Sequence, residues 1–116
     1  MKQVMVGDVV MPAAEVAKRP WEPLAPGAPA GIANTILSEH GGTIAGVLRI
    51  PAGVTLPAHA HRGMGHHVWV VDGAAHAFDR SLPRGSYWFV GAGHAHAIEG
   101  LAPDGCTLFY VDVPET

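Results

Sequence analysis

Glycine and proline divide this chain into short segments. The sequence holds 15 glycines and 10 prolines among 116 residues, and they recur about every eight to twelve residues, a spacing typical of all-β domains. The segments between them are rich in β-branched and aromatic residues, which favour strands. This pattern predicts an all-β sandwich or barrel. The predicted strands are Thr35–Ser38, Thr43–Ile50, His67–Val71, His76–Phe78, Ser86–Val90, Ala95–Ile98 and Thr107–Val111.

The first 30 residues have a different character. Pro12–Lys18 is the one plausible helix, at most about two turns long, because proline suits the opening position of a helix. The following segment, Arg19–Pro29, is rich in proline, and we expect it to form an extended arm. We therefore predict one domain, in which residues 1–30 pack on the barrel or on a partner subunit and residues 31–116 form the barrel.

Charge and hydropathy exclude several classes of function. The net charge is −3 and the seven Lys and Arg residues are scattered, whereas nucleic-acid binding requires clustered basic side chains. No apolar run approaches the roughly 20 residues of a membrane helix. Met1–Asp8 lacks the apolar core of a signal peptide, so we expect a cytoplasmic protein without a membrane partner. Cys106 has no second cysteine to pair with, and we predict that it is a buried, small apolar residue.

Histidine is the unusual residue of this composition, with eight copies against three Phe and two Tyr. His59 and His61 are two residues apart, so on a strand they face the same side with their Cα atoms about 6–7 Å apart. Two imidazoles in that position can bind one metal ion at about 2.1 Å. After a turn the chain returns through His66 and His67, and strand alternation allows only one of these two to face the same ion.

A second histidine pair, His94 and His96, follows a glycine turn. With these residues in place the chain resembles the cupins. The first cupin motif, G-x5-H-x-H-x3,4-E-x6-G, is matched by Gly53, His59, His61 and Gly73, with His66 at the position of the acid. The second motif, G-x5-P-x-G-x2-H-x3-N, is matched by Gly85, Gly93 and His96, while Gly91 and Gly100 replace the proline and the asparagine.

The resemblance implies a single double-stranded β-helix, or jelly-roll, barrel. By position it assigns His59, His61, His66 and His96 as metal ligands, with His66 either a direct ligand or a hydrogen-bonding partner of one. His94 competes with His96 for its place, and the spacing from Gly93 favours His96. His94 is then the nearby candidate for a catalytic base.

Imidazole ligands do not select one metal, because they suit Fe, Zn, Cu and Ni. An all-histidine set contains no carboxylate and leaves the full charge of a divalent ion in place. We therefore expect an acid-free site that favours an anionic, chelating substrate such as an enolate. Pro20–Leu24, Gly46–Gly53 and Gly85–Trp88 resemble small cupins that cleave β-diketones and hydroxyacetophenones with Fe(II) and dioxygen. They also resemble the zinc-binding cupin module of certain anti-sigma factors.

The leading hypothesis is therefore an Fe(II) dioxygenase that cleaves a carbon–carbon bond of a small diketone or aromatic ketone, with Zn or Ni as other possible metals. Two alternatives remain: a non-catalytic zinc-binding sensor or ligand-binding module, and a redox-neutral lyase or isomerase that uses the metal as a Lewis acid. One departure from the cleaving cupins is that Trp88–Gly91 contains no acid. The resemblance also implies a homodimer, supported by the apolar arm around Trp21.

Overall fold

The computed structural model describes residues 8–24, 28–59 and 63–115, and they are almost entirely β structure. Alternating inward and outward side chains, with glycine or proline at the turns, produce this arrangement. In this described part of the chain, a single short helix, α1 (Ala13–Ala17), precedes the strands. The strands are β1 (Glu22–Pro23), β2 (Ala33–His40), β3 (Thr43–Ile50), β4 (Thr55–His59), β5 (Met64–Ala77), β6 (Arg80–Pro83), β7 (Tyr87–Val90), β8 (His96–Gly100) and β9 (Cys106–Pro114).

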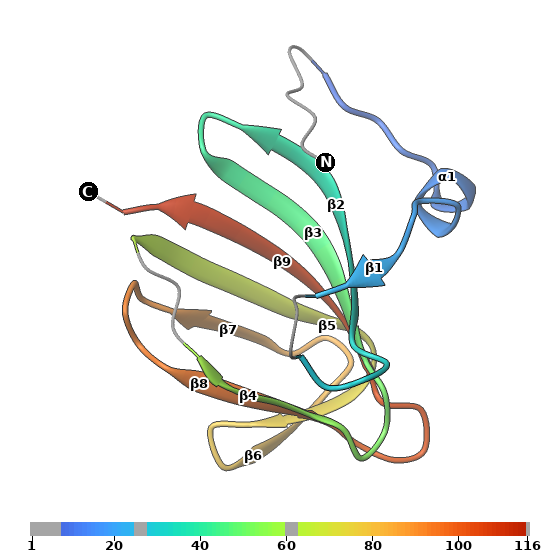
Figure 1. The fold of residues 1–116 in the computed structure, drawn as a ribbon, viewed down its shortest axis with the longest axis vertical. Coiled ribbons are helices and arrows are strands. Elements are labelled where there is room, and N and C mark those ends of the chain that lie inside the picture. The colour runs from blue at the N-terminus through green and yellow to red at the C-terminus, as the bar shows by residue number, and fades with distance from the viewer. Residues whose placement is uncertain (1–7, 25–27, 60–62, 116) are drawn as a thin grey trace.

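The strands form one curled, antiparallel sheet. Its order is β1-β2-β3-β9-β5-β8-β4, and β6 and β7 each pair with β5. The first part of β5 pairs with β9 and β7, and its last part pairs with β6 and β8. Figure 1 shows the result as two facing layers, with β2, β3 and β9 in one and β4 and β8 in the other. The predicted all-β barrel is confirmed.

Strand β5 is longer than the sequence predicted. His67–Val71 and His76–Phe78 were predicted as separate strands, but both lie in the continuous strand Met64–Ala77, apart from Phe78 in the turn that follows. The pairing with β9 shifts register between Val70 and Asp72, which marks a bulge. Gly73 follows in a left-handed conformation (φ 70°), and a Cβ there would lie 2.0 Å from a backbone oxygen. Glycine therefore lets β5 bend and continue from one layer into the other.

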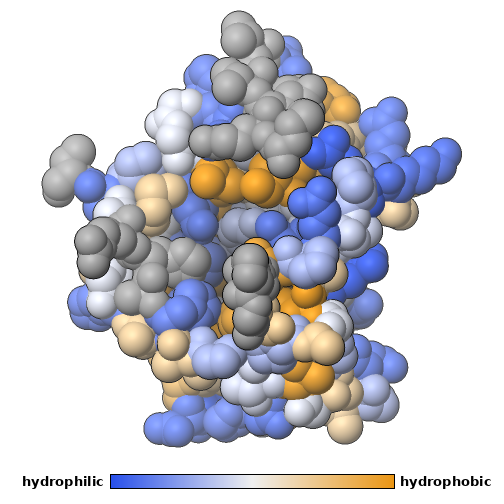
Figure 2. All heavy atoms as spheres, viewed as in Figure 1, coloured by the Kyte–Doolittle hydropathy of each residue, from blue (hydrophilic) through white to orange (hydrophobic). Residues whose placement is uncertain are grey.

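The core lies between the two layers. The largest of its fully buried side chains are aliphatic: Ile50, Val68, Val70, Ile98 and Leu108. Each stabilises the fold by roughly 1.5–3 kcal/mol relative to an exposed position. In the space-filling view, apolar residues gather near the middle of the visible face and hydrophilic residues surround them (Figure 2). A polar group facing this interior must therefore be held by hydrogen bonds or by a ligand.

The N-terminal arm packs on the outer edge of the sheet. Helix α1 is shorter than the predicted Pro12–Lys18. Strand β1 pairs with β2 through Glu22 and Asn34, and the Arg49 guanidinium lies 3.8 Å from the centre of the Trp21 ring. The arm is thus joined to the barrel, while its boundary at residue 30 stays a prediction. Among the described residues, no helix is both long and apolar enough to cross a membrane.

Candidate metal centre

His66 enters the barrel from β5. Strand alternation turns it inward together with Val68 and Val70, and only 6% of its surface is exposed. Its register partner on β9 is Asp112, and its ring atom Nδ1 is hydrogen-bonded to Asp112 Oδ1. A carboxylate accepts hydrogen bonds, so Nδ1 is the donor. The Nε2 atom then carries the lone pair and is the ring atom that can bind a metal.

His59 and His96 lie side by side on the neighbouring strands β4 and β8. They are register partners, their ring centres lie 4.5 Å apart, and His96 is only 5% exposed. His59 Nδ1 lies 2.9 Å from the carbonyl oxygen of Pro57. Because a carbonyl can only accept, this contact fixes the proton on Nδ1 and makes Nε2 the metal-binding atom of His59 as well.

The spacing of these rings fits metal coordination. A nitrogen at about 2.1 Å from an ion places the imidazole centre about 3.2 Å from it, so two neighbouring ligands have centres about 4.5–5.3 Å apart. The His59–His96 distance is 4.5 Å and the His66–His96 distance is 5.4 Å. Imidazole donors of this kind suit a divalent transition metal. Three strands from both layers of the barrel therefore bring His59, His66 and His96 near one another, although these three alone are not placed to hold an ion.

The remaining predicted site residues are placed differently. His61 lies outside the described residues, so its role as a ligand stays a prediction. Within residues 8–24, 28–59 and 63–115, no group of three His, Cys, Asp or Glu side chains is placed to hold a metal ion. His94 lies in the exposed turn before β8, where its backbone nitrogen donates to the Gly91 carbonyl. Its catalytic role also stays a prediction.

Asp112 is the residue that sequence reasoning missed. It is buried on β9, in line with the inward-facing Leu108 and Tyr110. The expectation of an acid-free site is therefore wrong, because a carboxylate contacts the histidine that replaces the motif acid. The available signal was an aspartate at an inward position of an apolar strand, since such a carboxylate requires a partner.

Two further titratable groups lie in the barrel wall. The Tyr110 hydroxyl donates to Asn34 Oδ1 at 2.7 Å, and burial, with a contribution from the Asp112 charge, raises the pKa of Tyr110 to about 12. Burial likewise raises the pKa of Cys106 to about 11. Both groups are therefore neutral at physiological pH. Cys106 is buried as predicted and, without a thiolate, is a poor nucleophile.

His67 lies on the opposite face of β5 from His66. Its Nδ1 is 2.8 Å from the Tyr87 hydroxyl, and its ring lies near Trp69 and Phe89. Trp69, Tyr87 and Phe89 are all exposed. This agrees with the prediction that only one of the two adjacent histidines faces the interior.

Comparison with known proteins agrees with the fold. The protein-family model for the ChrR cupin-like domain matches residues 10–114 of this sequence. The chain therefore belongs to the ChrR cupin-like family. A search of the curated proteins found no match.

Solved structures from several organisms share the fold. KdgF from Halomonas sp. is 19% identical with a TM-score of 0.72, and the match covers 96% of each chain. The polyketide cyclase RemF from Streptomyces resistomycificus is 16% identical with a TM-score of 0.72, over 89% of this chain and 79% of that one. The anti-sigma protein ChrR from Rhodobacter sphaeroides, in complex with SigE, is 25% identical with a TM-score of 0.67, over 78% of this chain and 46% of that one.

Proposed function

We propose that this chain binds one divalent transition metal through His59, His61, His66 and His96, and that Fe(II) is the active metal. The observation that carries this proposal is the approach of three imidazoles from both layers, with ring spacings of 4.5 and 5.4 Å. The hydrogen bonds at His59 and His66 orient two of these rings and leave Nε2 as the atom that can bind the metal. Such supporting partners commonly fix the tautomer of a metal-binding histidine.

The proposed reaction is oxidative cleavage of a carbon–carbon bond in a small diketone or aromatic ketone. Iron at this site would supply the redox chemistry that joins dioxygen to a chelated enolate. The chain's own residues position and protect the reactants. Asp112 holds His66 in place, and the aliphatic side chains of Val68, Val70 and Ile98 keep the interior apolar. His94 is the proposed base that takes the proton from the substrate.

Oxygen consumption tests this proposal. The protein would be loaded with Fe(II) under anaerobic conditions, and oxygen uptake would be recorded with acetylacetone, benzoylacetone and hydroxylated acetophenones. Uptake with at least one compound, lost in His96→Ala and kept in His67→Ala, is expected. No uptake with any of them from fully iron-loaded protein would reject the dioxygenase assignment.

A zinc-binding sensor module is the second candidate. The match to the ChrR cupin-like model and the likeness to ChrR itself, which was solved with SigE, favour it. Stoichiometric zinc in protein purified without added metal, together with no oxygen uptake after exchange to iron, would support this candidate over the enzyme.

We also propose that the chain forms a homodimer. Trp69, Tyr87 and Phe89 make an exposed aromatic group on the outer face of β5 and β7, and a second copy would shield these rings from water. Light scattering of the wild type and of Trp69→Ala tests this, and a monomeric wild type would reject it.

A further inference from the structure

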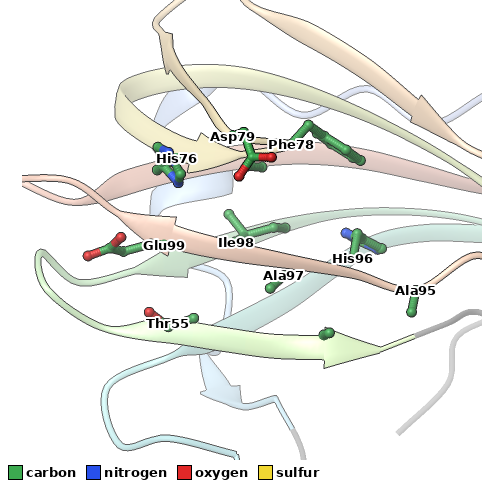
Figure 3. A pocket seen from close by; sticks show the side chains of 11 residues that line it. Thr55, His76, Phe78, Asp79, Ala95, His96, Ala97, Ile98 and Glu99 are labelled. Carbon is green, nitrogen blue, oxygen red and sulfur yellow. The ribbon is translucent and has the colours of Figure 1, made fainter.

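A cavity of about 410 Å³ lies beside His96, between β8 and the turn that joins β5 to β6. It exists because β5 and β8 pair only at Ala75–Gly100 and His76–Glu99. Beyond that point β5 turns back into β6, so His96 and Ile98 of β8 have no pairing partner on β5, although both pair with β4. Figure 3 shows the side chains of the turn on one side of this space and those of β8 on the other.

Phe78 forms the wall that faces His96. The two rings are nearly parallel, with an interplanar angle of 9° and centres 6.4 Å apart. Phe78 also makes an edge-to-face contact with the buried Trp88, with ring centres 5.9 Å apart. Even so, 49% of its surface is exposed. Phe78 and Asp79 both have left-handed φ angles, 55° and 58°, as this type of tight hairpin requires. The turn therefore holds an aromatic ring beside a predicted metal ligand, with half of it open to solvent.

Among the described residues that line this cavity, the acidic groups are two carboxylates. Asp79 comes from the turn and Glu99 from β8, and this described lining contains no Lys or Arg. His76 lies between the two in Figure 3. Small residues, Ala95 and Ala97 among them, line the β8 side and leave room for a ligand. An aromatic face together with carboxylates favours an organic cation.

We propose that this cavity receives the part of the substrate that extends away from the metal, that Phe78 forms its aromatic wall beside His96, and that Asp79 and Glu99 determine its charge specificity. Asp79 and Glu99 favour a substrate whose distal end carries a positive charge, such as an ammonium group, and disfavour one that ends in a carboxylate. This inference rests on the proposed metal-dependent function and specifies the substrate class of the same site.

Two metal-chelating probes whose distal groups carry opposite charges test the proposed preference for a positive charge. Binding of 4-(aminomethyl)benzohydroxamate and of 4-carboxybenzohydroxamate to the zinc-loaded protein would be measured by calorimetry. The ammonium compound should bind about tenfold more tightly, since two carboxylates act on its distal charge. The ratio should fall to about twofold or less in Asp79→Asn/Glu99→Gln and persist in Asp72→Asn/Asp104→Asn, which alters exposed acids that do not line the cavity. Equal affinities in the wild type, or a ratio unchanged in Asp79→Asn/Glu99→Gln, would overturn the selection.

A second measurement tests Phe78 without any metal. Carbethoxylation of His96 by diethyl pyrocarbonate, followed by peptide mass spectrometry, reports access to the ring from the cavity. The rate should rise severalfold in Phe78→Ala and in Phe78→Asn, a residue that tolerates left-handed backbone. It should not change in Phe89→Ala, whose side chain is similarly exposed at 47% but lies on the outer face. An unchanged rate in both Phe78 variants would remove this residue from the site.

Failure of the proposed reaction and failure of the cavity proposal give different results. Missing oxygen uptake with the ammonium preference intact would reject the reaction and keep the cavity. Oxygen uptake with equal hydroxamate affinities would keep the reaction and reject the cavity as its substrate pocket.

Discussion

His66 and His67 are adjacent in sequence, yet they lie in two different chemical environments. His66 faces the apolar interior, where Asp112 holds it beside His96. His67 faces outward, where it contacts the Tyr87 hydroxyl and neighbouring aromatic rings near solvent. The difference comes from strand parity alone, since successive residues of a strand point to opposite faces. Residue type therefore indicates a possible ligand, and position in the strand decides which histidine can act as one.

Replacing each of the two histidines in turn should give the largest difference between these environments, measured as zinc affinity. His66→Ala should weaken zinc affinity by at least about 100-fold, more than the loss of a mere supporting partner costs. His67→Ala should change it by less than about twofold, because that ring lies on the outer face. Competition with a chromogenic chelator measures both affinities. Equal losses of zinc affinity in the two variants would show that the face of the strand on which a histidine lies does not decide whether it binds the metal.

Removal of the carboxylate behind His66 should have the next largest effect. Asp112→Asn should lower metal affinity about 10–100-fold, the range typical of lost support for a metal-binding histidine. Asp112→Glu should recover part of that loss because it keeps the negative charge of a carboxylate acceptor, which Asn lacks, and Asp72→Asn, an exposed change on β5, serves as the control. Wild-type affinity in Asp112→Asn would assign the contact a structural role only.

Two buried groups that face the interior, Cys106 and Tyr110, should also lower the stability of the fold at alkaline pH. The pKa values of Cys106 and Tyr110 are raised from 9.0 and 10.0 to about 11 and about 12, so the folded state favours both neutral forms. Their contribution is fully present below pH 9 and is lost as pH rises through 11 and 12. Urea unfolding at a series of pH values should show a stability decrease of a few kcal/mol across that window. In Tyr110→Phe the decrease should be smaller, and an unchanged decrease would contradict this origin.

The smallest effect is expected on the outer face. Tyr87→Phe removes the hydroxyl that contacts His67, and because this pair is solvent-exposed its loss should change the free energy of unfolding by about 0.5 kcal/mol or less. Metal affinity should stay at the wild-type value. A loss of metal in Tyr87→Phe would mean that the two faces are coupled.

The fold could be predicted from the sequence because its signals are local. Glycine and proline mark the turns, and strand alternation correctly predicted that only one of His66 and His67 faces the interior. The bend of β5 was missed because it depends on Gly73 passing close to the backbone of Gly105. That contact joins residues far apart in sequence, and no local pattern indicates it.

The candidate site was predicted only in part, for the same physical reason. Two cupin motifs indicated the histidines, and His59, His66 and His96 lie together. Asp112 was missed because it lies outside both motifs and reaches His66 only through the pairing of β5 with β9. The cavity wall at Phe78 was missed because it depends on how β5 separates from β8.

X-ray absorption spectroscopy of the metal-loaded protein tests the central claim most directly, namely that inward-facing imidazoles, His66 among them, hold the ion. With one equivalent of zinc, the wild type should show nitrogen or oxygen ligands at about 2.0–2.1 Å with strong imidazole scattering. His66→Ala should lose one imidazole from that shell, and His67→Ala should leave the spectrum unchanged. An identical imidazole count in the wild type and in His66→Ala would contradict the account.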